Sequence, residues 1–467
     1  MKITMENIGL TRYAELEMND LTIICGQNNS GKTHIAYAIY GFFHFWNTSF
    51  QIPIDKEIIK KLKDTGYYKI QLSEFREKAP QIIERACFEY RDELHSVFST
   101  HESKFENSVL RLSVSPEEIE ITNKREITGR AQAASGKTGL KFVKKVGENE
   151  LTFTLFAEDD DTVDVPDFII MNVISNALKS CVFTSVCPNV FIASTERTGS
   201  AIFYKELDFA RNRILDTIAK KDDDIDFMQL LITSKDDYAR PVNHNVDFVR
   251  NLESISKQTG EICRKHSEIL AAFEDMLGGN YQVTDKGGLF FVPKGNPRKK
   301  IQLSVNESSS SVRSLLHFGF YLKHLANVGD LLIIDEPELN LHPDNQRKMA
   351  RLLANLVNCG MKIFITTHSD YILRELNNLI LLNGDSPHLA KIAKDEGYSK
   401  MELIKGGNIK IYSAEESLTK LPSNTKKSKV RTLVEVHVDD ENGILASDFD
   451  DAINDMNRIA DDIAFGG

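Results

Sequence analysis

Eight consecutive residues near the N-terminus have the spacing of a phosphate-binding loop. Residues 26–33 read GQNNSGKT, which fits the pattern G-x-x-x-x-G-K-[ST]. In this pattern the backbone N–H groups face phosphate oxygens, Lys32 supplies a positive charge and the Thr33 hydroxyl can bind Mg²⁺. An apolar strand expected over 21–24 and a helix expected over 32–45 give the loop the context it requires. The predicted nucleotide contacts are Gly26, Asn28, Asn29, Ser30, Gly31, Lys32, Thr33 and His34.

Two adjacent carboxylates follow a second apolar segment, far along the chain. The segment 331–334 is expected to be a buried strand, and Asp335 and Glu336 come directly after it. At such a strand end Asp335 can hold the water shell of a metal ion, and Glu336 can polarise an attacking water. We therefore predict that Asp335 binds Mg²⁺ together with Thr33 and that Glu336 is catalytic. A surface turn that happens to contain Asp-Glu is the alternative, and the phosphate-binding loop makes it the weaker one.

A third expected strand, over 362–366, leads into Thr367, His368 and Ser369. One helix separates it from the Asp-Glu strand, so His368 is predicted to act in catalysis as a sensor of the γ-phosphate. The alternative is a hydrogen-bonded histidine in a turn. A further GKT at 136–138 lacks the earlier glycine of the motif and a preceding apolar strand. It is predicted to be a basic loop.

Strands and helices alternate around these motifs, which predicts a parallel sheet. Residues 109–157 alternate apolar and polar side chains and predict an antiparallel sheet, with one strand around 118–121. A long helix with a coiled-coil-like seam is predicted over 248–276, and strands near 401–404 and 431–438. The predicted organisation has six parts. They are the first part of an ATPase head (1–50), a helical insertion (51–108), a β-rich lobe with a core strand (109–200), a helical coiled-coil-like insertion (201–278), the second part of the head (279–382) and an α/β tail with an acidic helix (383–467).

Composition excludes several classes of protein. The chain has 467 residues, of which 41% are hydrophobic and 27% charged, and its net charge is -11. A broadly basic nucleic-acid coat is therefore excluded, and no apolar run reaches the roughly 18–20 residues of a membrane helix. Six cysteines without a CxxC pair predict a reduced cytoplasmic protein without structural zinc. Two small basic clusters, at 294–300 and 426–431, leave contact with nucleic acid possible but not required.

Taken together, these motifs resemble those of ATPases of the ABC class, in the branch that includes SMC, Rad50, RecF and OLD proteins. The resemblance rests on residues 3–33, 335–343 and 367–369. It implies an α/β fold, an ABC-type P-loop ATPase head with a mixed sheet, an antiparallel β-subdomain and helical insertions. It also implies ATP hydrolysis with ATP and Mg²⁺ as cofactors, and homo-oligomers built from head-to-tail dimers.

The class also has a signature motif that contacts the γ-phosphate held by the partner subunit. Residues 308–313, before a helix, stand where this motif belongs, but they lack both glycines and the glutamine of Leu-Ser-Gly-Gly-Gln. The candidate contacts are Ser308, Ser309, Ser310 and Ser311. A serine-rich helix cap is the alternative, and which serine acts is left open. No glutamine could be assigned to the Q-loop of the class.

Within this branch the chain resembles the AAA15-type ATPases of bacterial anti-phage systems, first the AriA ATPases of PARIS systems and then the PtuA ATPases of Septu systems. This implies an ATP-hydrolysing sensor or scaffold subunit that controls a separately encoded Toprim-type nuclease, with a phage protein as a trigger. A DNA repair ATPase of the RecF or Rad50 kind is the alternative, and a transporter ATPase is a third class. A built-in nuclease is not expected, because Glu435 precedes the Asp-x-Asp pair of Asp448 and Asp450 too closely, with Asp448 only thirteen residues further on.

Overall fold

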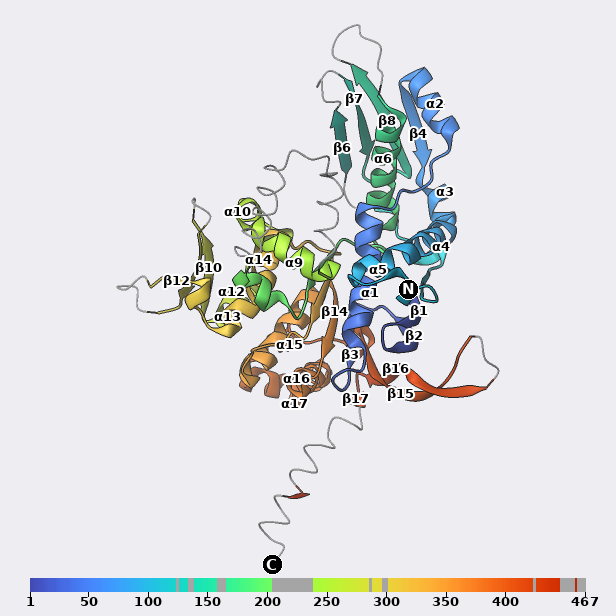
Figure 1. Ribbon diagram of the computed structural model, residues 1–467. Coiled ribbons are helices and arrows are strands. Elements are labelled where there is room, and N and C mark those ends of the chain that lie inside the picture. The colour runs from blue at the N-terminus through green and yellow to red at the C-terminus, as the bar shows by residue number, and fades with distance from the viewer. Residues whose placement is uncertain are drawn as a thin grey trace, which may run out of the picture.

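A seven-stranded mixed sheet forms the centre of the computed structural model (Figure 1). The structure describes residues 1–122, 126–132, 138–157, 165–203, 238–284, 288–295, 301–422, 426–445 and 458–459. The strand order in the sheet is β17-β16-β15-β3-β14-β13-β9. Their bounds are β3 Leu21–Cys25, β9 Val190–Ala193, β13 Leu331–Asp335, β14 Lys362–Thr367, β15 Ile409–Lys420, β16 Lys427–Asp439 and β17 Gly443–Leu445. The predicted strands that end in the three motifs are confirmed.

Helices cover both faces of this sheet. Neighbouring strands from β15 to β9 run parallel, and β3 and β13 are buried along their whole length. Ile24 and Ile333 pack into one core with α1 (Lys32–Thr48). Their neighbours along each strand pack into the other core with α15 (Pro343–Asn358) and α16 (Asp370–Leu381). Burial on both faces explains why these strands are continuous apolar runs in the sequence.

The N-terminal residues form a second sheet beside the first. Its order is β2-β1-β5, and its strands are β1 Lys2–Ile8, β2 Thr11–Glu17 and β5 Val109–Ser113. The hairpin of β1 and β2 was not predicted from the sequence.

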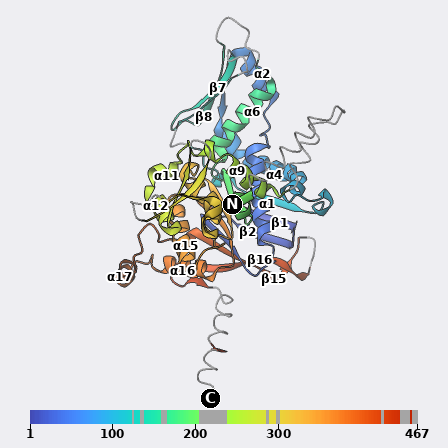
Figure 2. The ribbon, with the colours of Figure 1, turned by 60° about the vertical axis from the view of Figure 1, so that its left-hand side comes forward.

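An antiparallel lobe extends from the top of the molecule in both ribbon views (Figure 1, Figure 2). Its strand order is β4-β8-β7-β6, with β4 Tyr67–Gln71, β8 Glu150–Ala157, β7 Thr138–Lys144 and β6 Ile127–Gln132. The antiparallel prediction is confirmed, but a strand around 118–121 is wrong. Ser115 instead caps a short 3-10 turn over Pro116–Glu118. The other helices of this half are α2 Lys56–Thr65, α3 Leu72–Glu77, α4 Ala79–Tyr90, α5 Leu94–Val97 and α6 Asp167–Leu178.

The long helix predicted over 248–276 is wrong. Four shorter helices occupy this part of the chain: α9 Arg240–Arg250, α10 Leu252–Ile255, α11 Glu261–Lys265 and α12 Ser267–Leu277. The break before α11 is tied to the end of α14 (Leu316–His324), because the Gly260 amide donates to the Lys323 carbonyl at 3.1 Å. A Cβ on Gly260 would lie 2.9 Å from the Ala326 carbonyl oxygen. The apolar residues of the expected seam are buried in the core shared with α14, so their spacing reflects that core and not a coiled coil.

The last third of the chain confirms most predicted elements. A hairpin of β10 (Gly279–Val283) and β11 (Leu289–Pro293) precedes them, with β12 (Leu303–Ser304) beside it. The helix expected after the serine-rich turn is divided into α13 (Ser310–Ser314) and α14. A strand near 401–404 is wrong, and β15 begins later.

The helix α17 (Pro387–Asp395) follows α16. Residues 133–137, which include most of the predicted basic loop, lie outside the described residues, as do Asp448, Asp450 and most of the acidic C-terminal segment. None of the helices that the described residues form combines the length and the apolar character needed to cross a membrane.

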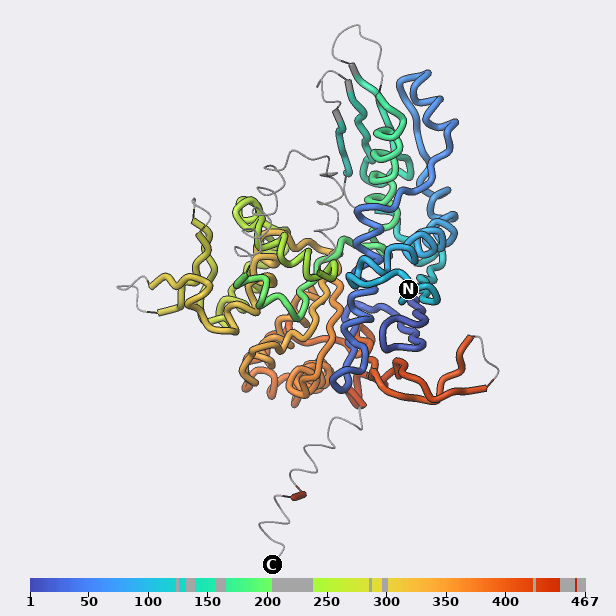
Figure 3. The backbone as a smooth tube through the Cα atoms, viewed as in Figure 1, coloured from blue at the N-terminus to red at the C-terminus, as the bar shows by residue number. Residues whose placement is uncertain are grey.

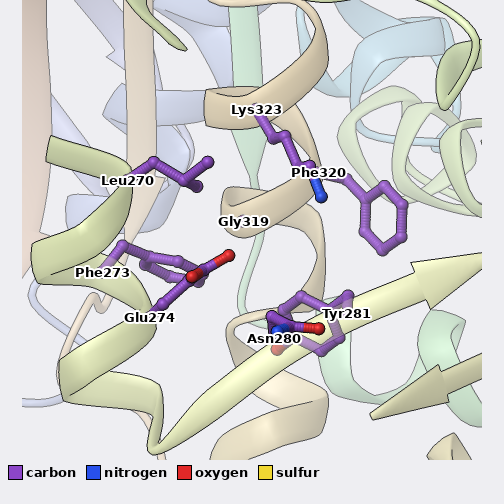
Figure 4. Close-up of a pocket in the computed structure, with 8 residues that line it drawn as sticks. All are labelled: Leu270, Phe273, Glu274, Asn280, Tyr281, Gly319, Phe320 and Lys323. Carbon is purple, nitrogen blue, oxygen red and sulfur yellow. The ribbon is translucent and has the colours of Figure 1, made fainter. Parts of the chain in front are cut away.

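Because α14 packs closely against α12 and β10, we predict that replacing Gly319 of α14 with a larger residue destabilises the fold. Gly319 lies beside a cavity of about 10 Å³, which Phe273 and Tyr281 also line (Figure 4). A Cβ at Gly319 would lie 2.6 Å from Phe273 and 2.9 Å from Tyr281. We expect Gly319→Val to lower the free energy of unfolding by about 1–3 kcal/mol, because the core cannot take the extra atoms without shifting. Chemical denaturation measures this effect.

The matched control is Gly407→Val. No atom lies within 4 Å of a Cβ built at Gly407, so this variant should unfold like the wild type. Equal stability of the two variants would contradict the packing described for Gly319.

Candidate functional site

The loop after β3 curls over the N-terminus of α1 in a conformation that favours glycine at two positions. Gly26 and Gly31 have φ values of 133° and 99°. A Cβ on Gly26 would lie 2.8 Å from the Ala414 carbonyl oxygen, and one on Gly31 would lie 2.8 Å from Thr11 Oγ1. Both glycines of the motif are thus required by backbone conformation and by close neighbours.

The ammonium group of Lys32 lies inside this loop. Nζ donates to the carbonyl oxygens of Gly26 at 3.0 Å and Gln27 at 2.8 Å, and it lies 3.3 Å from His368 Nδ1. Lys32 is buried, and this burial lowers its pKa, against the opposing effect of the carboxylates of Glu336 and Asp335. A positive charge held inside a glycine-containing loop at a helix N-terminus is suited to phosphate oxygens.

Asp335 ends β13 beside the first turn of α1. The Thr33 hydroxyl donates to its Oδ1 at 3.3 Å, and the Thr366 hydroxyl also donates to Oδ1. Asp335 is fully buried, and burial raises its pKa to about 6. Its other oxygen, Oδ2, is buried without a hydrogen-bond partner among the described residues.

Thr33 and Asp335 therefore fit a site for Mg²⁺. A carboxylate oxygen without a partner beside a hydroxyl can accept from the water shell of the ion. Nowhere in the described parts of the chain do three or more His, Cys, Asp or Glu side chains form a cluster able to hold a metal ion. Few protein ligands are typical of Mg²⁺ that binds mainly to phosphate oxygens and water.

Glu336 and His368 face each other at the carboxyl ends of the neighbouring strands β13 and β14. His368 Nε2 lies 3.1 Å from Glu336 Oε1, and this hydrogen bond is the main cause that lowers the pKa of Glu336. The backbone of Glu336 has a φ of 55°, and its amide donates to the Thr366 carbonyl at 3.1 Å. Glu338 accepts from the His368 amide at 2.6 Å and from the Thr367 hydroxyl at 2.9 Å. These bonds join the residues after β13 to the residues after β14.

The structure thus brings Lys32, Thr33, Asp335, Glu336 and His368 together at one edge of the sheet. They come from three neighbouring parallel strands, whose carboxyl ends meet there. His34 faces another way, because its ring packs against Gly9 and stacks on Phe98 at 5.5 Å.

The serine-rich turn lies apart from this group. Ser309 caps α13 by accepting from the Val312 amide at 3.4 Å, and its hydroxyl lies 2.9 Å from that of Ser311. Ser308 is buried, whereas Ser309 and Ser310 are exposed. Within the described residues, no hydrogen bond joins this turn to residues 26–33 of the same chain.

Arg197 is a site residue that the sequence interpretation missed. It follows β9, its side chain is 2% exposed, and its burial lowers its pKa. The guanidinium donates to four carbonyl oxygens: Ser194 at 2.8 Å, Ser314 at 2.9 Å, Asp335 at 2.7 Å and Glu336 at 2.7 Å. One side chain thus links the end of α13 to the backbone of both carboxylates. The signal available in the sequence was the polar run 194–197 after a buried strand, the same arrangement as in the other motifs.

A family model matches most of the chain. Residues 1–373 match a family model described as AAA ATPase domain, AAA_15. A putative ABC transporter ATP-binding protein of Methanothermobacter thermautotrophicus is 30% identical over 82 residues. That match covers 18% of this chain and 29% of the relative, so the chain spans less than a third of the length of that protein.

Three solved SMC head structures are distantly similar. The SMC head bound to the C-terminal winged-helix domain of ScpA has a TM-score of 0.33 and 10% identity, with 93% of this chain and 97% of that chain covered. The SMC head domain of Thermotoga maritima has a TM-score of 0.28 and 12% identity, with 94% and 98% covered. The third is an SMC head with an extended coiled coil, bound to the C-terminal domain of ScpA derived from Pyrococcus furiosus. It has a TM-score of 0.32 and 11% identity, with 98% of both chains covered.

Proposed function

Since this chain belongs to the AAA_15 family of AAA ATPase domains and is an ATP-hydrolysing P-loop enzyme, we propose that the residues at the edge of its central sheet bind and hydrolyse ATP. The AAA ATPase domain match and the mixed central sheet support an ABC-type P-loop ATPase head as its fold. The observation that carries the proposal is the contact chain from Lys32 through His368 to Glu336. A γ-phosphate bound at Lys32 would lie next to both other side chains.

Each side chain has a role that its surroundings support. Lys32 and the loop amides bind the β and γ phosphates, while Thr33 and Asp335 hold Mg²⁺. When bound, Mg²⁺ neutralises charge on the phosphate oxygens. Glu336 remains ionised, because the hydrogen bond with His368 lowers its pKa, and it polarises the attacking water. His368 orients this carboxylate and senses the γ-phosphate.

Arg197 acts as a positioning residue for Glu336. A lysine cannot donate to four carbonyl oxygens at once, because it presents a single ammonium group with three donors. We expect Arg197→Lys to lower kcat by about tenfold to a hundredfold, since a small misplacement of a catalytic group is costly, while the Kd for ATP stays unchanged. Steady-state hydrolysis and calorimetric ATP titration separate the two effects.

The control for this variant is Arg347→Lys, which changes a partly exposed arginine paired with Glu375 at 2.8 Å. It should keep wild-type kcat. An unchanged kcat in Arg197→Lys would show that Glu336 does not need this support.

We also propose that two heads pair head to tail, with the serine turn of one chain completing the ATP site of the other. Two observations support this arrangement: Ser309 and Ser310 are exposed, and the turn makes no hydrogen bond to the phosphate-binding loop of its own chain within the described residues. A site divided between subunits makes hydrolysis depend on assembly.

Complementation between two inactive variants tests the divided site. We expect Lys32→Ala and Ser310→Glu each to be inactive alone, because the first lacks the phosphate charge and the second repels the γ-phosphate. Glutamate in the first turn of α13 should not harm the helix. In an equal mixture roughly a quarter of the sites pair two undamaged halves, so hydrolysis should return to that extent. No recovery in oligomers shown by native mass spectrometry to be mixed would contradict the head-to-tail dimer.

For the cellular role, we propose an ATP-dependent sensor or scaffold of a bacterial anti-phage system, as in PARIS systems with their AriA ATPase, acting in the cytoplasm on a separate Toprim-type nuclease. Membership of the AAA_15 family supports this role. The antiparallel lobe of β4, β6, β7 and β8, which extends from the top of the molecule, also supports it as a surface for a partner (Figure 1). The alternative is a DNA repair ATPase of the RecF or Rad50 kind. Its Rad50-like form has less support, because the described residues 238–277 form four short helices.

Expression with and without the neighbouring genes tests this role. We expect protection from phage to need both an effector gene and an intact ATP site, and the purified chain to cut neither DNA nor tRNA. Nuclease activity that co-purifies with the chain would contradict a separate effector.

A further inference from the structure

Strands β15 and β16 form a two-stranded ribbon that extends past the central sheet. β15 pairs with β3 only over residues 409–413, whereas it pairs with β16 up to Lys420 and Lys427. The ribbon reaches out beyond β1 and β2 at the right of the molecule (Figure 1, Figure 3). Its outer part therefore has solvent-accessible faces.

One face of the outer ribbon is basic. The cross-strand pairs Glu416–Arg431, Leu418–Lys429 and Lys420–Lys427 alternate along the ribbon, so their six side chains share a face. Lys420, Lys427 and Lys429 are exposed. Glu416 lies 3.5 Å from Lys429 and 3.9 Å from Arg431, so a single carboxylate faces four cations. This face is positive although the whole chain carries a net charge of -11.

We propose that this basic face of the ribbon binds the sugar-phosphate backbone of a nucleic acid. Cations on one face of a strand recur about every 7 Å, which places a row of them along a backbone whose phosphates are spaced at about 3.4 Å of axis per strand. A two-stranded ribbon also fits the major groove of a duplex, which is about 12 Å wide.

An acidic protein is the competing partner, and the composition of the face argues against it. Interfaces between proteins depend on buried aromatic or large apolar anchors. The only apolar side chain among these six residues is Leu418. Phosphate contacts need no such anchor, because lysine and arginine supply most of the affinity.

The ribbon also adjoins the ATP site. Arg431 donates to the Asn29 carbonyl at 3.4 Å, and a groove of about 970 Å³ lies between the phosphate-binding loop and the base of the ribbon. A nucleic acid on the basic face would therefore lie next to bound nucleotide. The binding proposal itself does not depend on ATP hydrolysis, so the two can fail separately.

The test uses the full chain with Lys420→Gln, Lys427→Gln and Lys429→Gln combined. Fluorescence anisotropy with labelled duplex DNA, single-stranded DNA and RNA is measured over a series of salt concentrations. We expect the wild type to bind at least one of these. In the triple variant the slope of log K against log salt should fall by roughly 2–3, since each lost phosphate contact removes about 0.9.

The matched control combines Lys391→Gln, Lys394→Gln and Lys400→Gln, which removes the same charge from exposed positions in and after α17. This control should bind like the wild type, and both triple variants should keep basal ATP hydrolysis. The proposal is overturned if the wild type binds none of the three probes. It is also overturned if the control loses as much affinity as the ribbon variant, or if polyglutamate displaces the nucleic acid at equal or lower charge concentration.

Discussion

Lys32→Ala should weaken ATP binding by at least about thirtyfold, the equivalent of about 2 kcal/mol or more for a charged partner lost from a buried site. The ammonium group lies among the carbonyl oxygens of Gly26 and Gln27 and beside His368, so it is held inside the loop that is proposed to bind the phosphates. The fold should survive, because the alanine keeps the first turn of α1 helical. Calorimetric titration with ATP and Mg²⁺ measures the loss.

An exposed lysine provides the comparison for this variant. Lys61→Ala in α2 removes the same charge far from the loop and should leave the Kd for ATP unchanged. Thermal unfolding of both variants separates loss of binding from loss of fold. If Lys32→Ala bound ATP with wild-type affinity, residues 26–33 would not be the loop that binds the nucleotide.

The parts of the site that the sequence predicted share one local property. Residues 21–24, 331–334 and 362–366 are short apolar runs that end in polar residues, and all three lie in strands of the central sheet. A buried parallel strand must be apolar along its length, and its carboxyl end is where polar groups of neighbouring strands meet. This pattern of an apolar run followed by polar residues lies within a few consecutive positions. It can therefore be recognised in the sequence without knowledge of the fold.

The features that the sequence did not predict depend on contacts between distant segments. The polar run 194–197 was visible in the sequence, but the role of Arg197 depends on β9 lying beside β13, because its partners are backbone carbonyl oxygens, which have no sequence pattern. The predicted long helix fails at Gly260, where hydrogen bonds to the end of α14 turn the chain. The sequence showed the basic residues at 426–431 only as a cluster, and the face that three of them share is defined by the register of β15 with β16.

Glu336→Gln should bind ATP like the wild type but hydrolyse it about 10²–10⁴ times more slowly, the usual contribution of a general base. The amide has nearly the shape of the carboxylate and leaves Asp335 and Thr33 in place for Mg²⁺. What it loses is the negative charge that the hydrogen bond with His368 maintains by lowering the pKa of Glu336. Single-turnover hydrolysis measures the chemical step apart from product release.

Glu435→Gln is the control, because it changes an exposed carboxylate that lines the groove beside the phosphate-binding loop but lies on β16. It should hydrolyse ATP at the wild-type rate. If Glu336→Gln did so too, another group would have to accept the proton of the attacking water. Glu338 would then be the nearest candidate: burial raises its pKa, its Oε1 accepts from His368 and Thr367, and its Oε2 has no partner among the described residues. If Glu338→Gln hydrolysed ATP slowly and Glu336→Gln hydrolysed it at the wild-type rate, Glu338 would be the catalytic base. The roles of the other residues of the site would be unchanged.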